Sequence, residues 1–245
     1  MNAPSPAIAT AIVYPYQTLA ARLEAIVAEF SHAAFASSLG AEDMVVTDAI
    51  LSAGLPIAIF TLETGRLHRE TLDLLDRVRS HYGREIEAVR PAPDAVAGYV
   101  KEHGLNAFYE SVDLRKRCCY IRKVEPLARA LAGKDAWITG LRRTQSAARS
   151  ELPLREHDTV HGIPKFNPLA DWTEAEVWAC IRDRGVPFNA LHDRGYPSIG
   201  CEPCTRAIRP GEDIRAGRWW WESSDAKECG LHVAPPVNPS EGKQS

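Results

Sequence analysis

Apolar and polar positions along the first 150 residues follow two periods. Residues 16–30 place apolar side chains three and four positions apart, at Leu19, Leu23 and Ile26, which is the spacing of an amphipathic helix. Residues 33–39 and 56–62 are short, mostly apolar runs, as expected of buried parallel strands with helices on both faces. This alternation predicts an α/β fold with a doubly wound, mostly parallel sheet and right-handed crossovers.

The remaining pattern extends this prediction. Further helices are expected over 41–54, 66–83, 121–133 and 173–185, and further strands over 85–91 and 135–141. Thr173 and Glu176 have the spacing of a capping box. Residues 150–172 show little periodicity and predict a loop with one short extended piece. From residue 186 onward, Pro, Gly and polar residues predict an irregular segment that folds back over the sheet.

The expected organisation therefore has four parts. They are an N-terminal extension (1–15), an α/β domain (16–205), a mobile C-terminal segment (206–232) and a disordered tail (233–245).

Composition narrows the function classes. The net charge of −3 and the pI near 6.3 argue against a general nucleic-acid or membrane-surface binder. No apolar run has the ~20 residues of a membrane helix, and the N-terminus lacks a signal-peptide pattern. We therefore expect a cytoplasmic protein, in which grouped cysteines indicate metal binding or catalysis rather than disulfides. The sequence leaves open whether the chain forms a homo-oligomer.

One turn at a predicted strand end offers an anion site. Ser37, Ser38 and Gly40 lie where a strand gives way to a helix, so backbone N–H groups and a helix N-terminus could face a ligand. A plain serine-capped turn is the alternative. No Walker motif follows, and Glu42 and Asp43 in the first helical turn disfavour a polyphosphate as large as that of ATP.

Two further turns fall at the same predicted edge of the sheet. The first contains Leu62, Thr64 and Gly65, and the second follows a strand and carries Arg142, Arg143 and Arg149. A solvated loop is the commoner role for such a charge run. Their position at strand ends favours anion binding.

Four of the six cysteines form two tight pairs. Cys118 and Cys119 are adjacent, and Cys201 and Cys204 form a C-x-x-C pair. Four thiolates can hold zinc or an iron–sulfur cluster, but adjacent cysteines fit the zinc template poorly. We therefore favour a 4Fe–4S cluster. Lys123 follows Cys119 by four residues and is expected on the same helix face, although an exposed lysine is the simpler interpretation.

The other two cysteines differ from each other. Cys180 lies in an amphipathic helix and is expected to be a small core residue. Cys229 lies in a polar stretch between Lys227 and His232, where positive charge would favour its thiolate. A nucleophile on a mobile segment could close over a substrate.

These motifs together resemble the assimilatory adenylyl-sulfate (APS) reductases. The resemblance rests on SSLGAEDMVV, LETG, the Cys-Cys pair with Lys123, GLRRTQS, CEPCTRAI, GEDIRAGRWWWE and ECGLH. It implies a fold similar to the ATP pyrophosphatase (adenine nucleotide alpha hydrolase-like) type. It also implies a 4Fe–4S cluster held by the four paired cysteines.

The resemblance further implies a mechanism. Cys229 would attack the sulfur of APS, release AMP and form an S-sulfocysteine, from which reduced thioredoxin would expel sulfite. Lys123, Arg143, Arg215 and Arg218 are the candidates for neutralising the substrate anions. A reductase of the 3′-phosphorylated substrate PAPS, an ATP-dependent adenylating enzyme of the same fold and a zinc-binding module are the alternatives.

Overall fold

The computed structural model describes residues 6–146 and 149–222. Its helices are α1 (Pro6–Glu29), α2 (Ala41–Ser52), α3 (Arg69–Tyr82), α4 (Pro93–His103), α5 (Val112–Cys119), α6 (Glu125–Leu131) and α7 (Glu174–Arg184). Its strands are β1 (Ala33–Ala36), β2 (Ala58–Leu62), β3 (Glu87–Val89), β4 (Ala136–Ile138), β5 (Arg155–Asp158) and β6 (Ile163–Phe166). Short 3-10 turns are η1 (Ala107–Tyr109), η3 (Arg143–Gln145), η5 (His192–Arg194) and η6 (Glu202–Cys204), and η2 (Tyr120–Val124) is a π-helical turn between α5 and α6.

The six strands form one sheet in the order β3-β2-β1-β4-β6-β5. Every neighbouring pair is parallel except β5 with β6, which is antiparallel. The chain moves outward from β1 in one direction through β2 and β3, and later in the other direction through β4. This reversal places a topological switch point between β1 and β4, where ligands of such sheets usually bind.

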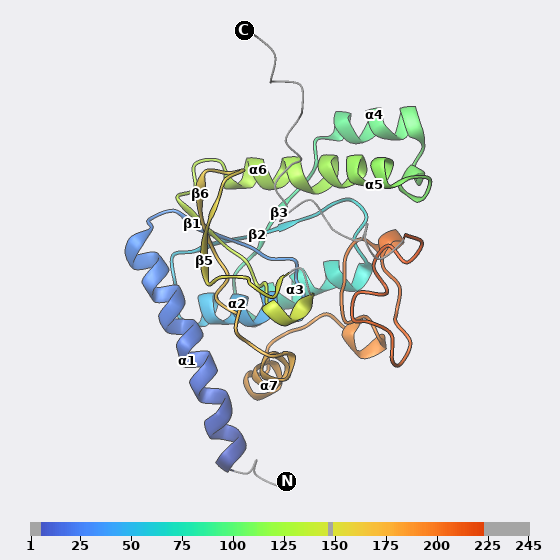
Figure 1. The fold of residues 1–245 in the computed structure, drawn as a ribbon. Coiled ribbons are helices and arrows are strands. Elements are labelled where there is room, and N and C mark those ends of the chain that lie inside the picture. The colour runs from blue at the N-terminus through green and yellow to red at the C-terminus, as the bar shows by residue number, and fades with distance from the viewer. Residues whose placement is uncertain (1–5, 147–148, 223–245) are drawn as a thin grey trace.

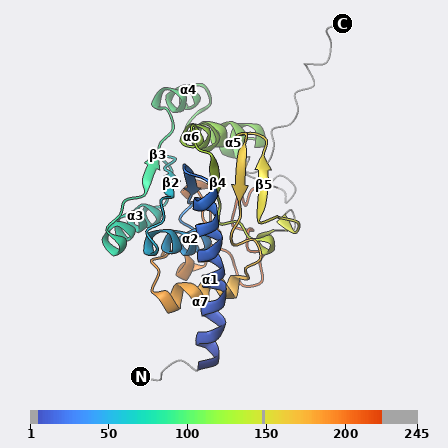
Figure 2. The ribbon, with the colours of Figure 1, turned by 90° about the vertical axis from the view of Figure 1, so that its left-hand side faces the viewer.

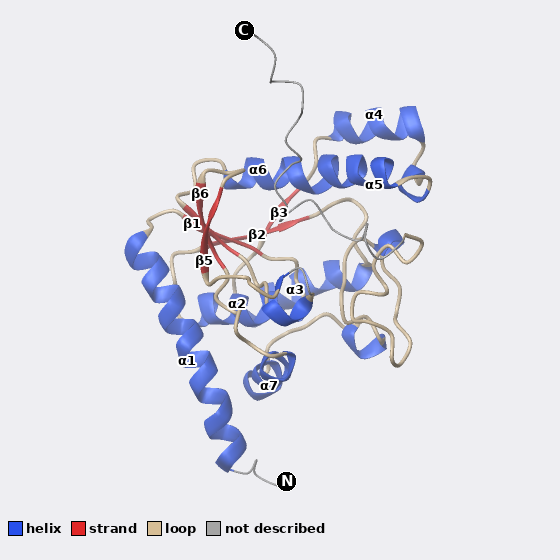
Figure 3. Cartoon of the chain, in the orientation of Figure 1, coloured by secondary structure: helices blue, strands red, loops and turns tan. Residues whose placement is uncertain are grey.

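Helices cover both faces of the sheet (Figure 1; Figure 2). On one face α1, α2, α3 and α7 pack around a core that includes Phe35, Met44, Leu74 and Ile181. On the other face α6 contributes Leu127 and Leu131, which pack on inward-facing residues of the strands. Figure 3 shows the strands between the two helix layers. The predicted α/β class and doubly wound sheet are confirmed.

The chain after α7 carries no long helix or strand in its described part and lies at the carboxyl edge of the sheet (Figure 1). A bridge between Leu67 and Cys201 and a hydrogen bond from the Glu202 backbone N–H to the Arg66 carbonyl, 2.7 Å long, attach it there. The expected irregular C-terminal segment is confirmed over residues 186–222. The segment from 223 to 245 lies outside the described residues.

Some predicted elements need correction. Residues 150–172 are not a loop with one extended piece, because β5 and β6 form a hairpin there and β6 lies next to β4 inside the sheet. Helix α1 begins at Pro6, ahead of the expected start at residue 16, and α4 was not anticipated. The capping box of α7 is confirmed, since the Thr173 and Glu176 side chains each accept a hydrogen bond from the other's backbone N–H.

No helix in the described part of the chain combines the length and apolar character needed to span a bilayer.

Candidate functional site

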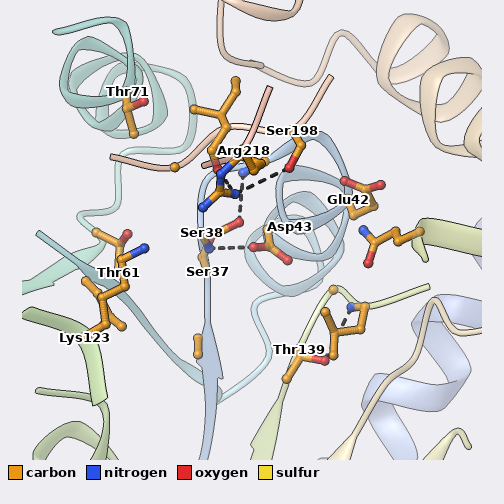
Figure 4. Close-up of a pocket in the computed structure, with 18 of the residues that line it drawn as sticks. Ser37, Ser38, Glu42, Asp43, Thr61, Thr71, Lys123, Thr139, Ser198 and Arg218 are labelled. Atoms are coloured by element: carbon orange, nitrogen blue, oxygen red, sulfur yellow. Dashed lines mark hydrogen bonds between the residues drawn. The ribbon is translucent and has the colours of Figure 1, made fainter. Parts of the chain in front are cut away.

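A cavity of about 240 Å³ opens at the carboxyl ends of β1, β2 and β4, at the switch point of the sheet. It is lined by Ala36 and Phe60 from the strands and by Thr139 just after β4. Nine residues singled out from the sequence as ligand-binding or catalytic candidates also line it: Ser37, Ser38, Gly40, Leu62, Thr64, Lys123, Arg149, Arg215 and Arg218. Figure 4 shows Ser38, Asp43, Lys123 and Arg218 gathered around this space.

In the turn after β1, backbone N–H groups donate to side chains of the same segment. The Ser38 N–H donates to a carboxylate oxygen of Asp43 (2.5 Å), and the Leu39 N–H donates to the Ser37 hydroxyl (3.2 Å). Leu39 adopts a left-handed backbone, with φ at 61°, which is costly for a non-glycine residue. The expectation of free N–H groups is therefore wrong for Ser38 and Leu39. Asp43 occupies the place that an anion would take.

Asp43 also contacts the turn after β4. The Gly140 backbone donates a hydrogen bond to its carboxylate, and a side-chain carbon at Gly140 would collide with that carboxylate. Burial, which is the largest effect, raises the pKa of Asp43 to about 6, against the opposing hydrogen bonds from Ser38 and Gly140. One buried carboxylate therefore ties the β1 and β4 turns together beneath the cavity.

Arg142 and Arg143 do not line this cavity. Arg142 is buried and donates from Nε and Nη2 to one carboxylate oxygen of Glu42, at 2.9 and 2.7 Å. Arg143 donates to the Leu152 carbonyl. Their charges are thus directed at protein groups, and the Arg142–Glu42 pair fixes the carboxylate at the start of α2.

Gly65 does not line the cavity either, although its position has a clear physical reason. Its φ of 72° favours glycine, and the Arg122 guanidinium lies 3.2 Å from where a Cβ would stand. Arg122 donates to the Thr64 carbonyl at 2.6 Å. The Thr64–Gly65 turn therefore connects the first cavity to η2, the π-helical turn that directly follows the two cysteines of α5.

A second, smaller cavity is lined by all four paired cysteines: Cys118, Cys119, Cys201 and Cys204. Cys118 and Cys119 come from the end of α5, whereas Cys201 and Cys204 flank and end η6. The thiol of Cys201 lies 3.2 Å from the Thr64 hydroxyl. Pairs separated by about 80 residues in the sequence are thus brought to one place by the fold.

The residues around this second cavity suit an anionic, thiolate-ligated metal centre. Four basic side chains line it, and two of them, Arg115 and Arg122, are buried; the other two are Arg66 and Lys123. Burial, the largest effect, raises the pKa of Cys204 to about 12, so its thiolate needs a cationic partner such as a metal. Among residues 6–146 and 149–222, however, no three His, Cys, Asp or Glu side chains are arranged to hold a metal ion. The thiols surround a space instead of converging on one point.

The two cavities share a wall. Lys123, Cys201 and Trp219 line both of them. Lys123 reaches this position from the π-helical turn η2, a geometry that is common at functional sites. A ligand in the larger cavity and a group held by the cysteines would therefore be separated by single side chains.

The segment after η6 brings Arg215 and Arg218 to the larger cavity. The Arg218 guanidinium passes so close to Gly200 that a Cβ there would overlap it. Residue Trp219 follows with φ at 42° and 1% exposure, and its N–H donates to the Cys204 carbonyl (3.1 Å). Trp219 therefore packs into the domain and anchors the segment that carries Arg215 and Arg218.

The two cysteines outside the pairs are Cys180 and Cys229. Cys180 is 1% exposed in the core, as predicted. Cys229 lies outside the described residues, so its role stays a prediction.

Three buried residues were missed by the sequence reasoning. Asp43 was read as a repulsive carboxylate, and Arg115 and Arg122 had no assigned role. All three are charged residues that are almost inaccessible, between 1% and 7% exposed. The signal available in the sequence was the density of arginines around the Cys-Cys pair, in RKRCCYIRK.

Known proteins of one family are similar to this chain over most of its length. The model of a family described as phosphoadenosine phosphosulfate reductase domain matches residues 32–207. An adenosine 5'-phosphosulfate reductase of Burkholderia cepacia is 61% identical, over 97% of this chain and 98% of its own length. One of Allochromatium vinosum is 60% identical, over 86% of this chain and 82% of its own.

Solved structures show the same fold. A phosphoadenylyl-sulfate (PAPS) reductase of Candida auris, in a phosphate complex, superimposes with a TM-score of 0.66 at 27% identity and covers 85% of this chain and 99% of its own. An FMN adenylyltransferase of Candida glabrata, only 12% identical, covers 98% of this chain and 83% of its own with a TM-score of 0.58. The second likeness concerns the fold alone.

Proposed function

Because the chain belongs to the phosphoadenosine phosphosulfate reductase domain family, we propose that it reduces adenosine 5'-phosphosulfate (APS) to sulfite and AMP in sulfate assimilation. The names of its relatives from Burkholderia cepacia and Allochromatium vinosum support this substrate. The observation that carries the proposal is the shared wall, with Lys123 and Cys201 between a cation-lined ligand cavity and a four-thiol cavity.

In the first step the Cys229 thiolate attacks the sulfur of APS. An S–S bond forms, the bond between sulfur and the bridging oxygen breaks, and AMP leaves with that oxygen. The product on the enzyme is an S-sulfocysteine, which is a covalent intermediate of an activated thiolate. A phosphate leaving group needs no proton, so no general acid is assigned.

The chain must bring an anionic nucleophile to an anionic substrate. Lys123, Arg215 and Arg218 line the cavity and would neutralise the phosphosulfate, with the arginines suited to two-pronged contact with its oxygens. The nucleoside would lie along Ser37, Ser38, Gly40, Leu62 and Thr64 at the strand ends. Arg142, Arg143 and Gly65 would act one layer away, by holding these turns.

Cys118, Cys119, Cys201 and Cys204 would hold one 4Fe–4S cluster. Their placement around a cavity with buried cations supports a thiolate-ligated group, and the adjacent Cys-Cys pair favours a cluster over zinc. When bound, the cluster would contribute charge and structural ties, because the two electrons of the reaction come from thiols.

In the second step a dithiol reductant of the thioredoxin class completes the cycle. Its thiolate attacks the Cys229 sulfur, expels sulfite and forms a mixed disulfide, which its second thiol resolves by releasing the Cys229 thiolate. The enzyme returns unchanged and the reductant becomes a disulfide. Such reductants keep thiols reduced in the cytoplasm, where we expect this enzyme to act.

Intact-mass measurement tests this function. Anaerobically purified protein is mixed with APS without reductant, and we expect a gain of one SO3 group on Cys229 that thioredoxin releases as sulfite. Cys229→Ser should bind APS without an adduct, whereas the buried Cys180→Ala should still form it. No adduct in protein that holds iron and sulfide would refute the proposal. Turnover of PAPS above that of APS would instead assign the 3′-phosphorylated substrate.

A further inference from the structure

A buried ion pair joins the helix of the Cys-Cys pair to the last described residue. Arg115 on α5 donates from Nε and Nη2 to the two carboxylate oxygens of Glu222, each at 2.8 Å. The Arg115 side chain is 1% exposed and that of Glu222 is 5% exposed. The two residues are 107 positions apart in the sequence, so this contact exists only in the folded chain.

The pair also contacts Trp219, whose ring lies close to the guanidinium groups of two arginines. The Arg115 guanidinium lies 4.6 Å from the Trp219 ring centroid, and the Arg218 guanidinium lies 4.7 Å from it. The Glu222 N–H donates to the Trp219 carbonyl at 2.9 Å, which closes the turn. The left-handed backbone of Trp219 persists only because such contacts hold it.

A buried ion pair contributes little net stability, since the cost of removing both charges from water offsets their attraction. Loss of one partner, however, leaves an uncompensated buried charge. Such a pair is therefore better suited to fixing one arrangement than to stabilising the fold. The arrangement fixed here ends at Arg218, in the wall of the ligand cavity.

We propose that the Arg115–Glu222 ion pair is a positioning element for the sulfur-transfer step. It sets Arg218 through Trp219, and it fixes the point from which the chain proceeds to Cys229. Cys229 follows Glu222 by seven residues, so its Cα can lie at most about 25 Å from the Cα of this anchor. This inference rests on the proposed function, because it assigns the pair to that reaction.

The test uses Glu222→Gln, which keeps the shape of the side chain and removes its charge. Iron and sulfide per chain and the binding of AMP, which lacks the sulfate, are measured first and should match those of the wild type. Single-turnover formation of the Cys229 adduct at saturating APS should then slow at least tenfold. Alkylation of Cys229 by iodoacetamide without substrate should keep its rate, since that reagent needs no positioned arginine. Glu222→Asp should recover part of the adduct-forming rate.

Asp48→Asn is the matched control. It removes the buried acid of another ion pair, Asp48–Arg184, which joins α2 to α7 away from the cavity and whose arginine is partly exposed. We expect this variant to lose stability and keep the rate of adduct formation. Equal adduct rates in Glu222→Gln and wild type, or an equal slowing in Asp48→Asn, would overturn the positioning role. Absence of an adduct in the wild type would refute the proposed function instead.

Discussion

At the scale of single residues, Gly140 is required by the carboxylate that it faces. A methyl group there would collide with Asp43 and push it away from the Ser38 N–H. We expect Gly140→Ala to lower the free energy of unfolding by about 1–3 kcal/mol, as overpacking does, and to weaken AMP binding. Urea denaturation and calorimetric titration measure the two effects.

Gly98→Ala provides the matched control for that substitution. Gly98 lies inside α4, and nothing stands within 4 Å of its added Cβ. Alanine there should raise helix stability by up to about 1 kcal/mol. A Gly140→Ala variant as stable as Gly98→Ala would contradict the close packing at Asp43.

Asp43 also predicts a pH dependence. Burial raises the pKa of its carboxyl in the folded chain from 3.8 to about 6, so the folded chain binds this proton more tightly than the unfolded chain. The contribution of Asp43 to the free energy of unfolding therefore falls as pH rises from about 4 to about 6. The stability difference between wild type and Asp43→Asn should shrink by about 1–3 kcal/mol over that range. Denaturation curves at matched pH values measure it, and a constant difference would contradict the raised pKa.

Lys123 carries the residue-scale prediction for catalysis. Lys123→Ala should retain iron but lose roughly 10²- to 10³-fold in turnover, the effect of removing one donor to a transition-state anion. Lys101→Ala, on the exposed face of α4, is the control and should leave turnover unchanged. If Lys123→Ala has unaltered kinetics, Lys123 takes no part in the reaction.

Sequence reasoning identified single residues where the chemistry is local. The paired cysteines and Lys123 could be assigned to one site, because their residue types and their spacing along the chain are enough to predict it. Arg142 was expected to face a ligand, yet it pairs with Glu42, 100 positions away. Partners at such separation leave no trace in a single sequence, so the direction of a buried charge could not be predicted.

At the scale of elements, the start of helix α7 is stabilised by a capping box that is recognisable in the sequence. The Thr173 side chain accepts a hydrogen bond from the Glu176 N–H, and the Glu176 carboxylate accepts one from the Thr173 N–H. Thr173→Ala should lower the free energy of unfolding by about 1 kcal/mol. Thr173→Ser should retain most of the stabilisation that the cap contributes, because serine keeps the hydroxyl. Urea denaturation distinguishes them, and equal stability of both variants would contradict the capping role.

Elements without a local signal were missed. The β5–β6 hairpin has four-residue strands, and β6 contains Pro164 and Lys165, so neither apolar alternation nor strand propensity marks it. What places β6 is its pairing with β4, where Phe166 lies opposite Ile138 and packs into the core. Helices α2, α3 and α7 were predictable because each buries a face and ends near a glycine.

At the scale of the whole molecule, the described fold and the proposed nucleophile occupy different parts of the chain. A chain ending at Glu222 keeps the sheet, both cavities and the Arg115 pair. We expect it to unfold within a few degrees of wild type and to bind AMP, yet to form no adduct. A chain ending at His232 should form the adduct normally. Thermal denaturation and intact mass measure both, and adduct formation by the shorter chain would exclude Cys229.

The wall that the two cavities share also limits how the enzyme can be redesigned. Thr71 and Gln145 line the ligand cavity alone, so an engineer can alter them to accept a different nucleotide while leaving the cysteines untouched. Lys123, Cys201 and Trp219 offer no such freedom, since any replacement changes both chambers at once. Libraries for a new substrate should vary the first pair and keep these three residues constant.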